Sequence, residues 1–286
     1  MTRTVYLNGA YLPEGEARVS IFDRGFVMGD AVYEVTAVVD GKLVDFPGHL
    51  ARLERSLSEL AMGNPLTEDE WLAAHRELVA RNGVVNGMVY LQVSRGNGGD
   101  RDFAYPPEGT PQTVVLFTQD SPALVDNPAA QTGIKVITLP DLRWHRRDIK
   151  TVQLLYPSMA KMAAKARGKN DAWLVEDGTV TEGSSNNAWI VKDGVLITRS
   201  LSHDILHGIT RAAVKRLAED LQLRVEERAF SVAEAQAADE AFVTSASSFV
   251  MPVVEIDDVA VAGGKPGPVA TRMREVYIAA MREAAI

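Results

Sequence analysis

The segment from residue 181 to residue 211 decides the fold. It opens with Thr181-Glu-Gly-Ser-Ser-Asn-Asn187, continues through apolar stretches at 187–191 and 195–198, and ends on Leu206-His-Gly-Ile-Thr-Arg211. The apolar stretches are typical of buried strands, and the last motif precedes apolar residues at helical spacing. Polar loops beside buried strands often carry functional residues, although a solvated loop is the commoner case. The segment therefore predicts buried strands, a helix, and polar loops between them.

Strand and helix patterns alternate along the rest of the chain as well. Strands are expected at 4–12 (a hairpin), 32–39, 88–94, 113–118, 134–139, 172–176, 187–191, 195–198, 224–228 and 241–244. Helices are expected at 47–62, from Thr67 onward behind a Thr67/Glu70 capping box, and at 151–167, 209–221, 231–237 and 268–284. This alternation predicts a mixed α/β (α+β) fold.

A break in the patterns separates two expected domains. Residues 119–131 contain two prolines, several turn formers and no periodicity, which is typical of a linker. We therefore expect a smaller N-terminal domain over 1–118 and a larger C-terminal domain over 132–286.

Composition excludes several classes of function. The chain has 286 residues, 46% hydrophobic and 24% charged, a formal net charge of −8 and no cysteine. The absence of cysteine removes disulfides, thiolate metal ligands and a cysteine nucleophile. The acidic balance argues against nucleic acid or an anionic membrane as the partner. The N-terminus lacks the apolar run of a signal peptide, and no stretch approaches the ~20 apolar residues of a membrane span, so we expect a cytoplasmic protein.

Two local features indicate a functional site before any related protein is considered: a lysine that could act as a nucleophile and a helix start that could bind an anion. Lys150 follows Ile149 and precedes a largely apolar stretch, so partial desolvation would make its amine a nucleophile. A surface lysine at a strand end fits the same pattern equally well. Gly208-Ile-Thr210 opens the expected helix at 209–221, where free N–H groups and the helix dipole favour an anion such as phosphate. A plain helix cap is the more common alternative.

Other chemistries have little support in the sequence. The histidines are scattered, and nothing adds a third ligand to His203 and His207, so no metal site is expected. Glu176 and Asp177 are adjacent, and neighbouring side chains of a strand point to opposite faces. Such pairs are turn residues rather than the two carboxylates of a hydrolase.

Several motifs resemble, in order and spacing, those of the fold-type IV pyridoxal-phosphate enzymes. This family includes D-amino-acid and branched-chain aminotransferases and aminodeoxychorismate lyase. The matching motifs are Phe22-Asp-Arg-Gly-Phe-Val-Met-Gly-Asp-Ala-Val-Tyr-Glu34, His49-Leu-Ala-Arg-Leu53, Asp148-Ile-Lys150, Glu182-Gly-Ser-Ser-Asn-Asn-Ala-Trp189, Leu196-Ile-Thr198 and Leu206-His-Gly-Ile-Thr-Arg211. The one mismatch is Trp189, where Phe or Tyr is usual and which should only repack. The resemblance implies a small N-terminal α/β domain and a larger C-terminal mixed sheet or barrel with helices.

The resemblance also implies a role for individual residues toward pyridoxal 5′-phosphate. Lys150 would hold the cofactor as a Schiff base and then act as general acid and base. Glu182 would face the pyridine nitrogen and keep it protonated. Arg52 would bind the phosphate as a charge-assisted fork. The backbone amides of Ile209, Thr210, Ser245 and Ala246 would bind the remaining phosphate oxygens. Many relatives have a hydroxyl where this chain has Ala246, so one hydrogen bond is lost unless Ser247 replaces it.

Within the family, D-amino-acid aminotransferases are the most similar. They bind the substrate carboxylate with a Tyr of the N-terminal strand and an Arg and His of an Arg-x-His-x-Phe-Pro loop from the partner subunit. Tyr33 matches the Tyr, and Arg101 and Phe103 take the Arg and His places if one residue is inserted before the loop. Phe103 would weaken the anion site or make the pocket more tolerant of apolar groups. Arg95 is the alternative carboxylate binder, and a surface pair of Arg101 with Asp100 or Asp102 also fits.

The resemblance implies a homodimeric transaminase. It would move an amino group from a D-amino acid, such as D-alanine, to a 2-oxo acid, such as 2-oxoglutarate. The alternatives on the same scaffold are a branched-chain L-amino-acid transaminase, an (R)-amine transaminase and an aminodeoxychorismate lyase.

Overall fold

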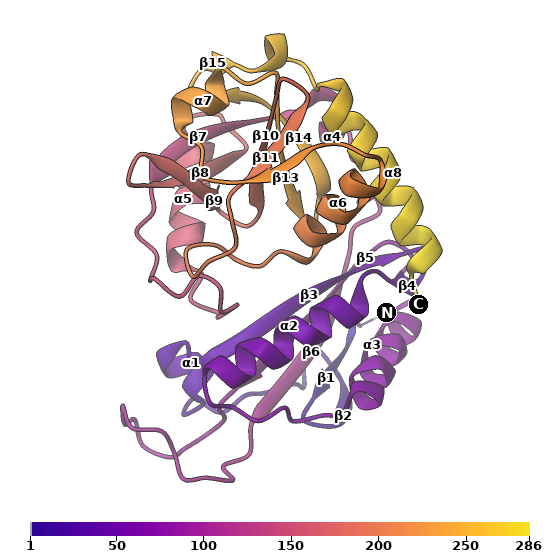
Figure 1. Ribbon diagram of the computed structural model, residues 1–286. Helices are drawn as coiled ribbons and strands as arrows, with labels where there is room; N and C mark the ends of the chain where they lie inside the picture. Colours follow the sequence, from indigo (N-terminus) through magenta and orange to yellow (C-terminus); the bar gives the residue numbers. More distant parts are fainter. Residues whose placement is uncertain (1) are drawn as a thin grey trace. The chain divides into compact units, whose positions relative to one another are not determined.

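The computed structural model describes residues 2–286, which divide into two compact units. The first unit contains the chain up to Pro122, together with Ile149–Gln153 and Ala284–Ile286. The second contains Ala123–Asp148 and Leu154–Glu283. Each unit combines a sheet with helices, which confirms the expected mixed α/β class in two parts (Figure 1).

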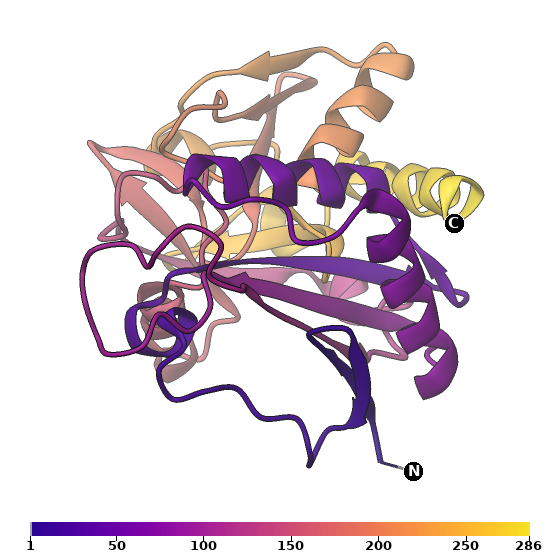
Figure 2. The same ribbon diagram turned by 90° about the horizontal axis from the view of Figure 1, so that it is seen from below.

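The first unit is built on a six-stranded sheet in the order β2-β1-β6-β5-β3-β4, with antiparallel neighbours throughout. Its strands are β1 (Thr4–Leu7), β2 (Ala10–Pro13), β3 (Ala31–Val39), β4 (Lys42–Leu43), β5 (Gly87–Ser94) and β6 (Thr113–Asp120). Its helices are α1 (Arg24–Met28), α2 (Phe46–Glu59) and α3 (Glu68–Asn82). Figure 2 shows α2 and α3 lying against the sheet, and the long loop between β5 and β6 extending away from it.

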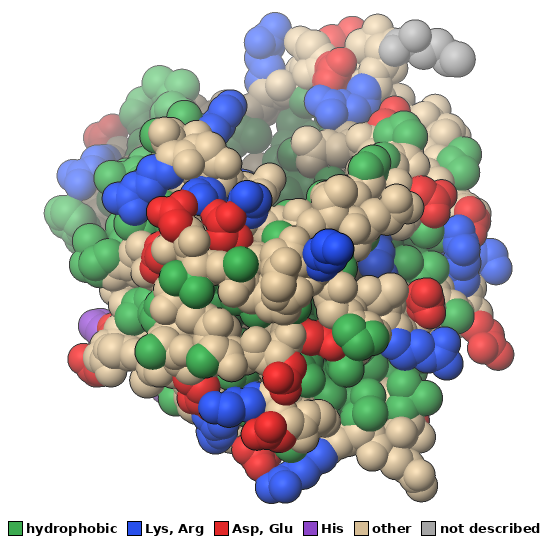
Figure 3. Space-filling model, turned by 90° about the horizontal axis from the view of Figure 1, so that it is seen from above, with side chains coloured by type: hydrophobic (Ala, Val, Ile, Leu, Met, Phe, Trp, Pro, Cys, Tyr) green, Lys and Arg blue, Asp and Glu red, His purple; other side chains and the backbone are tan. Residues whose placement is uncertain are grey.

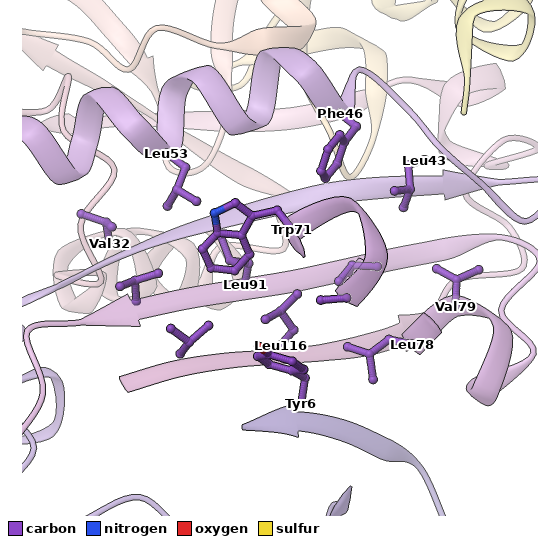
Figure 4. Packing of buried hydrophobic residues seen from close by; sticks show 14 of the residues in the cluster. Tyr6, Val32, Leu43, Phe46, Leu53, Trp71, Leu78, Val79, Leu91 and Leu116 are labelled. Carbon is purple, nitrogen blue, oxygen red and sulfur yellow. The ribbon is translucent and has the colours of Figure 1, made fainter. Parts of the chain in front are cut away.

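One apolar core joins these helices to one face of the sheet. Buried side chains recur at every second residue of β5, as a strand with one covered face requires. Leu91 of β5 and Leu53 of α2 pack around the ring of Trp71 from α3 (Figure 4). Trp71 is fully buried, and its Nε1–H donates to Asn64 Oδ1 at 2.9 Å, so its polar atom is satisfied.

The second unit is built on a nine-stranded mixed sheet in the order β12-β11-β10-β13-β14-β7-β8-β9, with β15 beside β14. Its strands are β7 (Ile134–Pro140), β8 (Asp171–Glu176), β9 (Thr179–Gly183), β10 (Asn187–Lys192), β11 (Val195–Thr198), β12 (Val225–Glu227), β13 (Glu240–Ser245), β14 (Phe249–Ile256) and β15 (Val259–Ala260). Its helices are α4 (Ala129–Thr132), α5 (Leu155–Ala166), α6 (Ile209–Asp220), α7 (Val232–Gln236), the 3-10 turn η1 (Ala262–Gly264) and α8 (Pro268–Ala284). Helix α5 packs on β7 and β8, whereas α6 packs on β12 and β13, on the opposite side of this unit in Figure 1.

The sequence patterns missed strand β14. Its centre contains Pro252, which has no N–H to donate and argues against a central strand. In the structure Pro252 lies opposite Phe242 of β13, and the parallel ladder to β7 begins only at Val253. The proline is tolerated because it precedes that second ladder.

The helix expected at 151–167 begins only at Leu155. The residues before it follow the edge of β3 in the first unit. The N–H of Tyr33 donates to the carbonyl of Lys150 at 3.0 Å, and the N–H of Val152 donates to Ala31 at 3.1 Å. Thr151 forms an isolated bridge with Val32. These bonds hold the residues in an extended conformation and assign Ile149–Gln153 to the first unit, whereas the sequence prediction placed them with the second.

The change from the first unit to the second lies within the linker expected at 119–131. The first stretch of the first unit ends at Pro122 and the second unit begins at Ala123, with the short helix α4 starting at Ala129. The chain returns to the first unit at Ile149–Gln153 and at Ala284–Ile286. Over residues 2–286, no helix has the length and apolar character needed to cross a bilayer. Acidic and basic side chains are interspersed on the face shown in Figure 3.

Candidate active site

Lys150 lies in the first unit, fixed by its backbone. Its carbonyl accepts from Tyr33, and its N–H donates to Ser56 Oγ of α2 at 3.4 Å. Its Nζ lies 4.1 Å from the centroid of the Tyr33 ring. Among the described residues, no carboxylate lies within ion-pair distance of that amine. The structure therefore brings the two predicted residues Lys150 and Tyr33 together and leaves the amine beside a ring rather than an acid.

Arg52 of α2 is held by a buried carboxylate on β3. Its Nε and a terminal nitrogen both donate to Glu34 at 2.7 Å, and His49 Nδ1 lies 2.8 Å from the same carboxylate. Burial alone would raise the pKa of Glu34, but the charge and hydrogen bonds of Arg52 lower that pKa to about 2. Glu34 is thus ionised and fixes the orientation of the Arg52 guanidinium. Sequence analysis did not single out Glu34, although its place next to Tyr33 on a strand gives it the core-facing position.

Arg95 and Arg101 have different surroundings in the first unit. Arg95 is buried, donates to Asp30 at 2.8 Å and to the carbonyl of Leu60 at 2.7 Å, and stacks on Tyr105 with its guanidinium carbon 3.7 Å from the ring centroid. Its guanidinium is therefore already engaged by the protein.

Arg101, by contrast, is exposed on the loop between β5 and β6. Its guanidinium carbon lies 4.7 Å from the ring centroid of Phe103, which is 79% exposed. The alternative, a surface pair with Asp100 or Asp102, is not among the ion pairs of the described residues.

Glu182 is a buried carboxylate of the second unit, near the end of β9. One oxygen accepts from Arg143 at 2.5 Å, and the other accepts from Asn187 Nδ2 and from the N–H of Leu206, each at 3.0 Å. Burial raises the pKa of Glu182, and the Arg143 charge opposes that rise. Asp141 holds Arg143 in turn through two hydrogen bonds of 2.9 and 2.7 Å. Neither Arg143 nor Asn187 was predicted as a site residue, although Asn187 stands within the quoted motif.

Asn187 contacts three parts of the second unit that were predicted to contribute to the site: Glu182, the start of α6 and the end of β13. Its Nδ2 also donates to the carbonyl of Leu206 at 2.9 Å. A Cβ on Gly208 would lie 1.9 Å from Asn187 Oδ1, so only glycine fits at this approach. The backbone of Asn187 pairs with Thr244, the neighbour of Ser245. Glu182, the start of α6 and the end of β13 therefore gather around one amide.

Two backbone features of this cluster suit an anion. Helix α6 begins at Ile209 as expected, and its N-cap Gly208 supplies no side-chain cap. The N–H groups of Ile209 and Thr210 have no acceptor within the helix because they lie in its first turn. The second feature is the tight turn from Ser245 to Phe249, which contains Ala246.

Trp189, the departure from the family motif, is fully buried in this unit. It stacks on Phe242 with ring centroids 5.5 Å apart, and its Nε1–H donates to Thr244 Oγ1 at 3.1 Å. The core therefore accommodates the larger ring, which also bonds to the residue before Ser245.

With this geometry established, comparison with known proteins identifies the family. A family model described as amino-transferase class IV matches residues 31–256. The chain is a class IV aminotransferase. D-alanine aminotransferase of Staphylococcus aureus (strain MSSA476) is 36% identical over 273 residues, which cover 96% of both chains. D-alanine aminotransferase of Bacillus licheniformis is 38% identical over 265 residues, which cover 92% of both chains.

Solved structures of the same class share the fold. A branched-chain amino acid aminotransferase from T.th., solved with pyridoxamine 5′-phosphate, has a TM-score of 0.88 at 29% identity, covering 98% of this chain and 94% of that one. The branched-chain enzyme of Escherichia coli has a TM-score of 0.87 at 22% identity, covering 98% and 95%, which supports the fold alone. These findings confirm the fold type, the aminotransferase class and the pyridoxal 5′-phosphate cofactor.

The residues present fit this cofactor chemically. In this class IV aminotransferase the amine of Lys150 lies beside the Tyr33 ring, with no ion pair among the described residues, and can bond an aldehyde. The buried carboxylate of Glu182 can act as the acceptor for a ring N–H. The first-turn amides of α6 suit a phosphate, and Gly208 leaves no Cβ in the way. No cluster of metal-ligating side chains occurs within residues 2–286.

Proposed function

We propose that this class IV aminotransferase moves the amino group of a D-amino acid, such as D-alanine, to a 2-oxo acid, such as 2-oxoglutarate. The single observation that carries the donor class is the 36–38% identity to D-alanine aminotransferases over nearly the whole chain. Tyr33 matches the Tyr of the D-type motif, and Arg101 matches its Arg with one residue inserted before the loop, which supports the same donor class. The branched-chain structures of similar fold make L-leucine and L-valine the competing donors.

The proposal gives Lys150 two roles and Glu182 one role toward the cofactor. Pyridoxal phosphate, when bound, carries the amino group and stores the electrons released at the substrate Cα. Lys150 holds the cofactor through Nζ, and the same amine then moves the Cα proton. Glu182 accepts the N–H of the pyridine ring, and its ionised form keeps that proton in place.

The phosphate is bound by Arg52 and by the amides of Ile209, Thr210, Ser245 and Ala246. The Glu34 carboxylate supports this by fixing the Arg52 guanidinium through two hydrogen bonds. A guanidinium charge and a helix N-terminus both favour a bound phosphate.

The substrate carboxylate is bound by Arg101 and Tyr33. Arg95 is the weaker candidate because Asp30, Leu60 and Tyr105 already engage its guanidinium. Phe103 offers an apolar ring where the D-type motif has a hydrogen-bond donor, so we expect tolerance of apolar substrate side chains.

The enzyme acts as a homodimer in this proposal, and the Arg101 loop completes the site of the partner. Helix α5 supports a partner surface, because Leu155, Met159 and Met162 lie on one helical face and are 76%, 57% and 61% exposed. Such an apolar stripe on a helix is typical of an interface.

A donor screen tests the proposed function. Purified enzyme is mixed with 2-oxoglutarate and one donor at a time, pairing D-alanine with L-alanine and D-leucine with L-leucine. We expect turnover with the D-donors, and turnover restricted to L-leucine and L-valine would replace the proposal by the branched-chain function. Borohydride reduction of the loaded enzyme should attach the cofactor to the tryptic peptide that contains Lys150. Lys150→Ala should lose that adduct and the turnover together.

A further inference from the structure

A buried arginine outside the predicted site clamps the turn from Ser245 to Phe249. Arg274 of α8 is 7% exposed, and one terminal nitrogen donates to the carbonyls of Ser248 at 2.7 Å and Val250 at 2.8 Å. These two carbonyls flank Phe249 on either side. The other terminal nitrogen donates to the carbonyl of Val125 at 2.8 Å. A single guanidinium thus joins the turn, helix α8 and the segment at Val125.

The residue between the two bonded carbonyls has an unfavourable backbone conformation. Phe249 has φ of +60°, a region that aromatic residues rarely adopt. Its side chain is fully buried and packs on Tyr277 of α8 with ring centroids 5.5 Å apart. Strain of this kind persists only when its surroundings over-determine the conformation. Arg274 and Tyr277, three residues apart on one helix, supply those surroundings.

The guanidinium of Arg274 forms no ion pair with a carboxylate among the described side chains. Its hydrogen bonds all go to backbone carbonyls. Desolvation lowers the pKa of Arg274, and the nearby charge of Asp126 only partly opposes this. Burying a guanidinium against carbonyls alone is costly, so this arrangement is unexpected for a residue that serves packing only.

The strained residue closes the turn that contains the proposed phosphate amides. Ser245 is the last residue of β13 and pairs with Phe249, so residues 246–248 form the connection. Ser245 Oγ also lies 2.7 Å from Ser248 Oγ. The direction of the amides at Ser245 and Ala246 therefore depends on the backbone angles that Arg274 fixes.

We propose that Arg274 is a positioning residue for the cofactor phosphate, which it affects through the 245–249 turn without touching it. The inference rests on the proposed phosphate site. It identifies α8, near the C-terminus of the chain, as the element that holds this part of the site in its binding conformation.

The test compares pyridoxal phosphate with pyridoxal, which lacks the phosphate. Dissociation constants are measured for both by absorbance titration of the apo-enzyme. Arg274→Met should raise the dissociation constant of pyridoxal phosphate at least about tenfold, the size of one lost charge-assisted hydrogen bond. It should leave the dissociation constant of pyridoxal within about twofold of the wild-type value. Arg274→Lys, which keeps the charge and some donors, should give an intermediate loss. Arg272→Met, two residues away and exposed, is the matched control and should change neither constant.

Each outcome decides between the possibilities. The inference is overturned if Arg274→Met weakens the binding of both ligands equally, or weakens the binding of neither. If Arg274→Met does not fold, the comparison is made with Arg274→Lys, and an unchanged ratio of the two dissociation constants overturns the inference likewise.

A second variant tests the phosphate site itself, because Ala246→Pro removes one amide of the turn directly. If Ala246→Pro leaves pyridoxal phosphate binding unchanged, the proposed phosphate site is wrong. If Ala246→Pro weakens it selectively and the Arg274 variants do not, only the inference fails.

Discussion

At the scale of single residues, the two candidate arginines of the substrate site are separated by what already binds them. Arg95 is held by Asp30 and by Leu60, whereas Arg101 is exposed beside Phe103. Arg101→Ala should therefore raise the KM for D-alanine by about 10- to 100-fold, the size of a lost charged hydrogen bond to a carboxylate. Steady-state kinetics over a range of donor concentrations measure this change.

The exposed Arg76 of α3 provides the control for this variant, and Arg76→Ala should leave KM unchanged. Arg95→Met should instead lower the unfolding temperature, because it removes a buried partner of Asp30. An Arg101→Ala enzyme with the KM of the wild type would show that another group binds the carboxylate.

Arg143 should affect the pH dependence of turnover, because its charge influences the pKa of Glu182. Burial raises the pKa of Glu182, and the Arg143 charge holds the rise in check. Turnover needs the ionised carboxylate, so it falls as the pH drops through this pKa. Arg143→Gln removes the opposing charge, raises the pKa of Glu182 further and should move the acidic limb of the kcat profile to higher pH.

This shift is measured by kcat profiles from about pH 5 to about pH 9 with saturating D-alanine. Arg146→Gln is the control, since Arg146 pairs with Asp148 rather than with Glu182. An acidic limb that does not move in Arg143→Gln would mean that Glu182 does not control turnover.

At the scale of elements, helix α3 shows a local signal that was predictable. Thr67 Oγ1 accepts from the N–H of Glu70, and the Glu70 side chain accepts from the N–H of Thr67 at 2.8 Å, which confirms the capping box. Thr67→Ala should reduce the free energy of unfolding by about 1 kcal/mol. Denaturant unfolding measures this change, and Thr67→Ser, which keeps the oxygen, is the control. A loss in Thr67→Ser as large as that in Thr67→Ala would exclude the cap as the cause.

The elements that sequence analysis located are those with local signals. Helix α6 begins at Ile209 because Gly208 and the following apolar spacing mark its start within a few residues. Lys150 and Glu182 could be predicted as site residues because their motifs are short and contiguous in the sequence. Strand β14 was missed because Pro252 argues locally against a strand, and only its place in the sheet makes that proline acceptable.

The residues that support the site were not predictable for the same reason. Arg143 bonds Glu182 across 39 positions of sequence, and Arg274 bonds Val125 across 149. No periodicity or motif encodes a pair at such separation. The extended conformation at Lys150 likewise depends on pairing with β3, so the sequence predicted a helix starting too early.

At the scale of the whole molecule, the exposed stripe on α5 predicts how assembly responds to charge. Leu155→Glu combined with Met159→Glu places two carboxylates on an apolar face that a partner would cover. The cost of burying unpaired charges should shift a dimer to monomers, measured by light scattering after gel filtration. Leu221→Glu, at the exposed end of α6, is the control and should not change the mass. A wild-type protein that is monomeric and fully active would contradict the dimer itself.

If the Arg101 loop serves the partner's site, an inactive Lys150 variant and an impaired Arg101 variant should complement each other in one dimer. Lys150→Ala and Arg101→Ala subunits are co-expressed with different tags, and the heterodimer is isolated by two successive affinity steps. One of its two sites then combines an intact Lys150 with an intact Arg101, and the other site lacks both. The heterodimer should show about half of the wild-type kcat, because a twofold assembly holds two equivalent sites. If Arg101 acted within its own subunit, neither site would be complete, and the heterodimer would be no more active at low donor concentration than the Arg101→Ala homodimer.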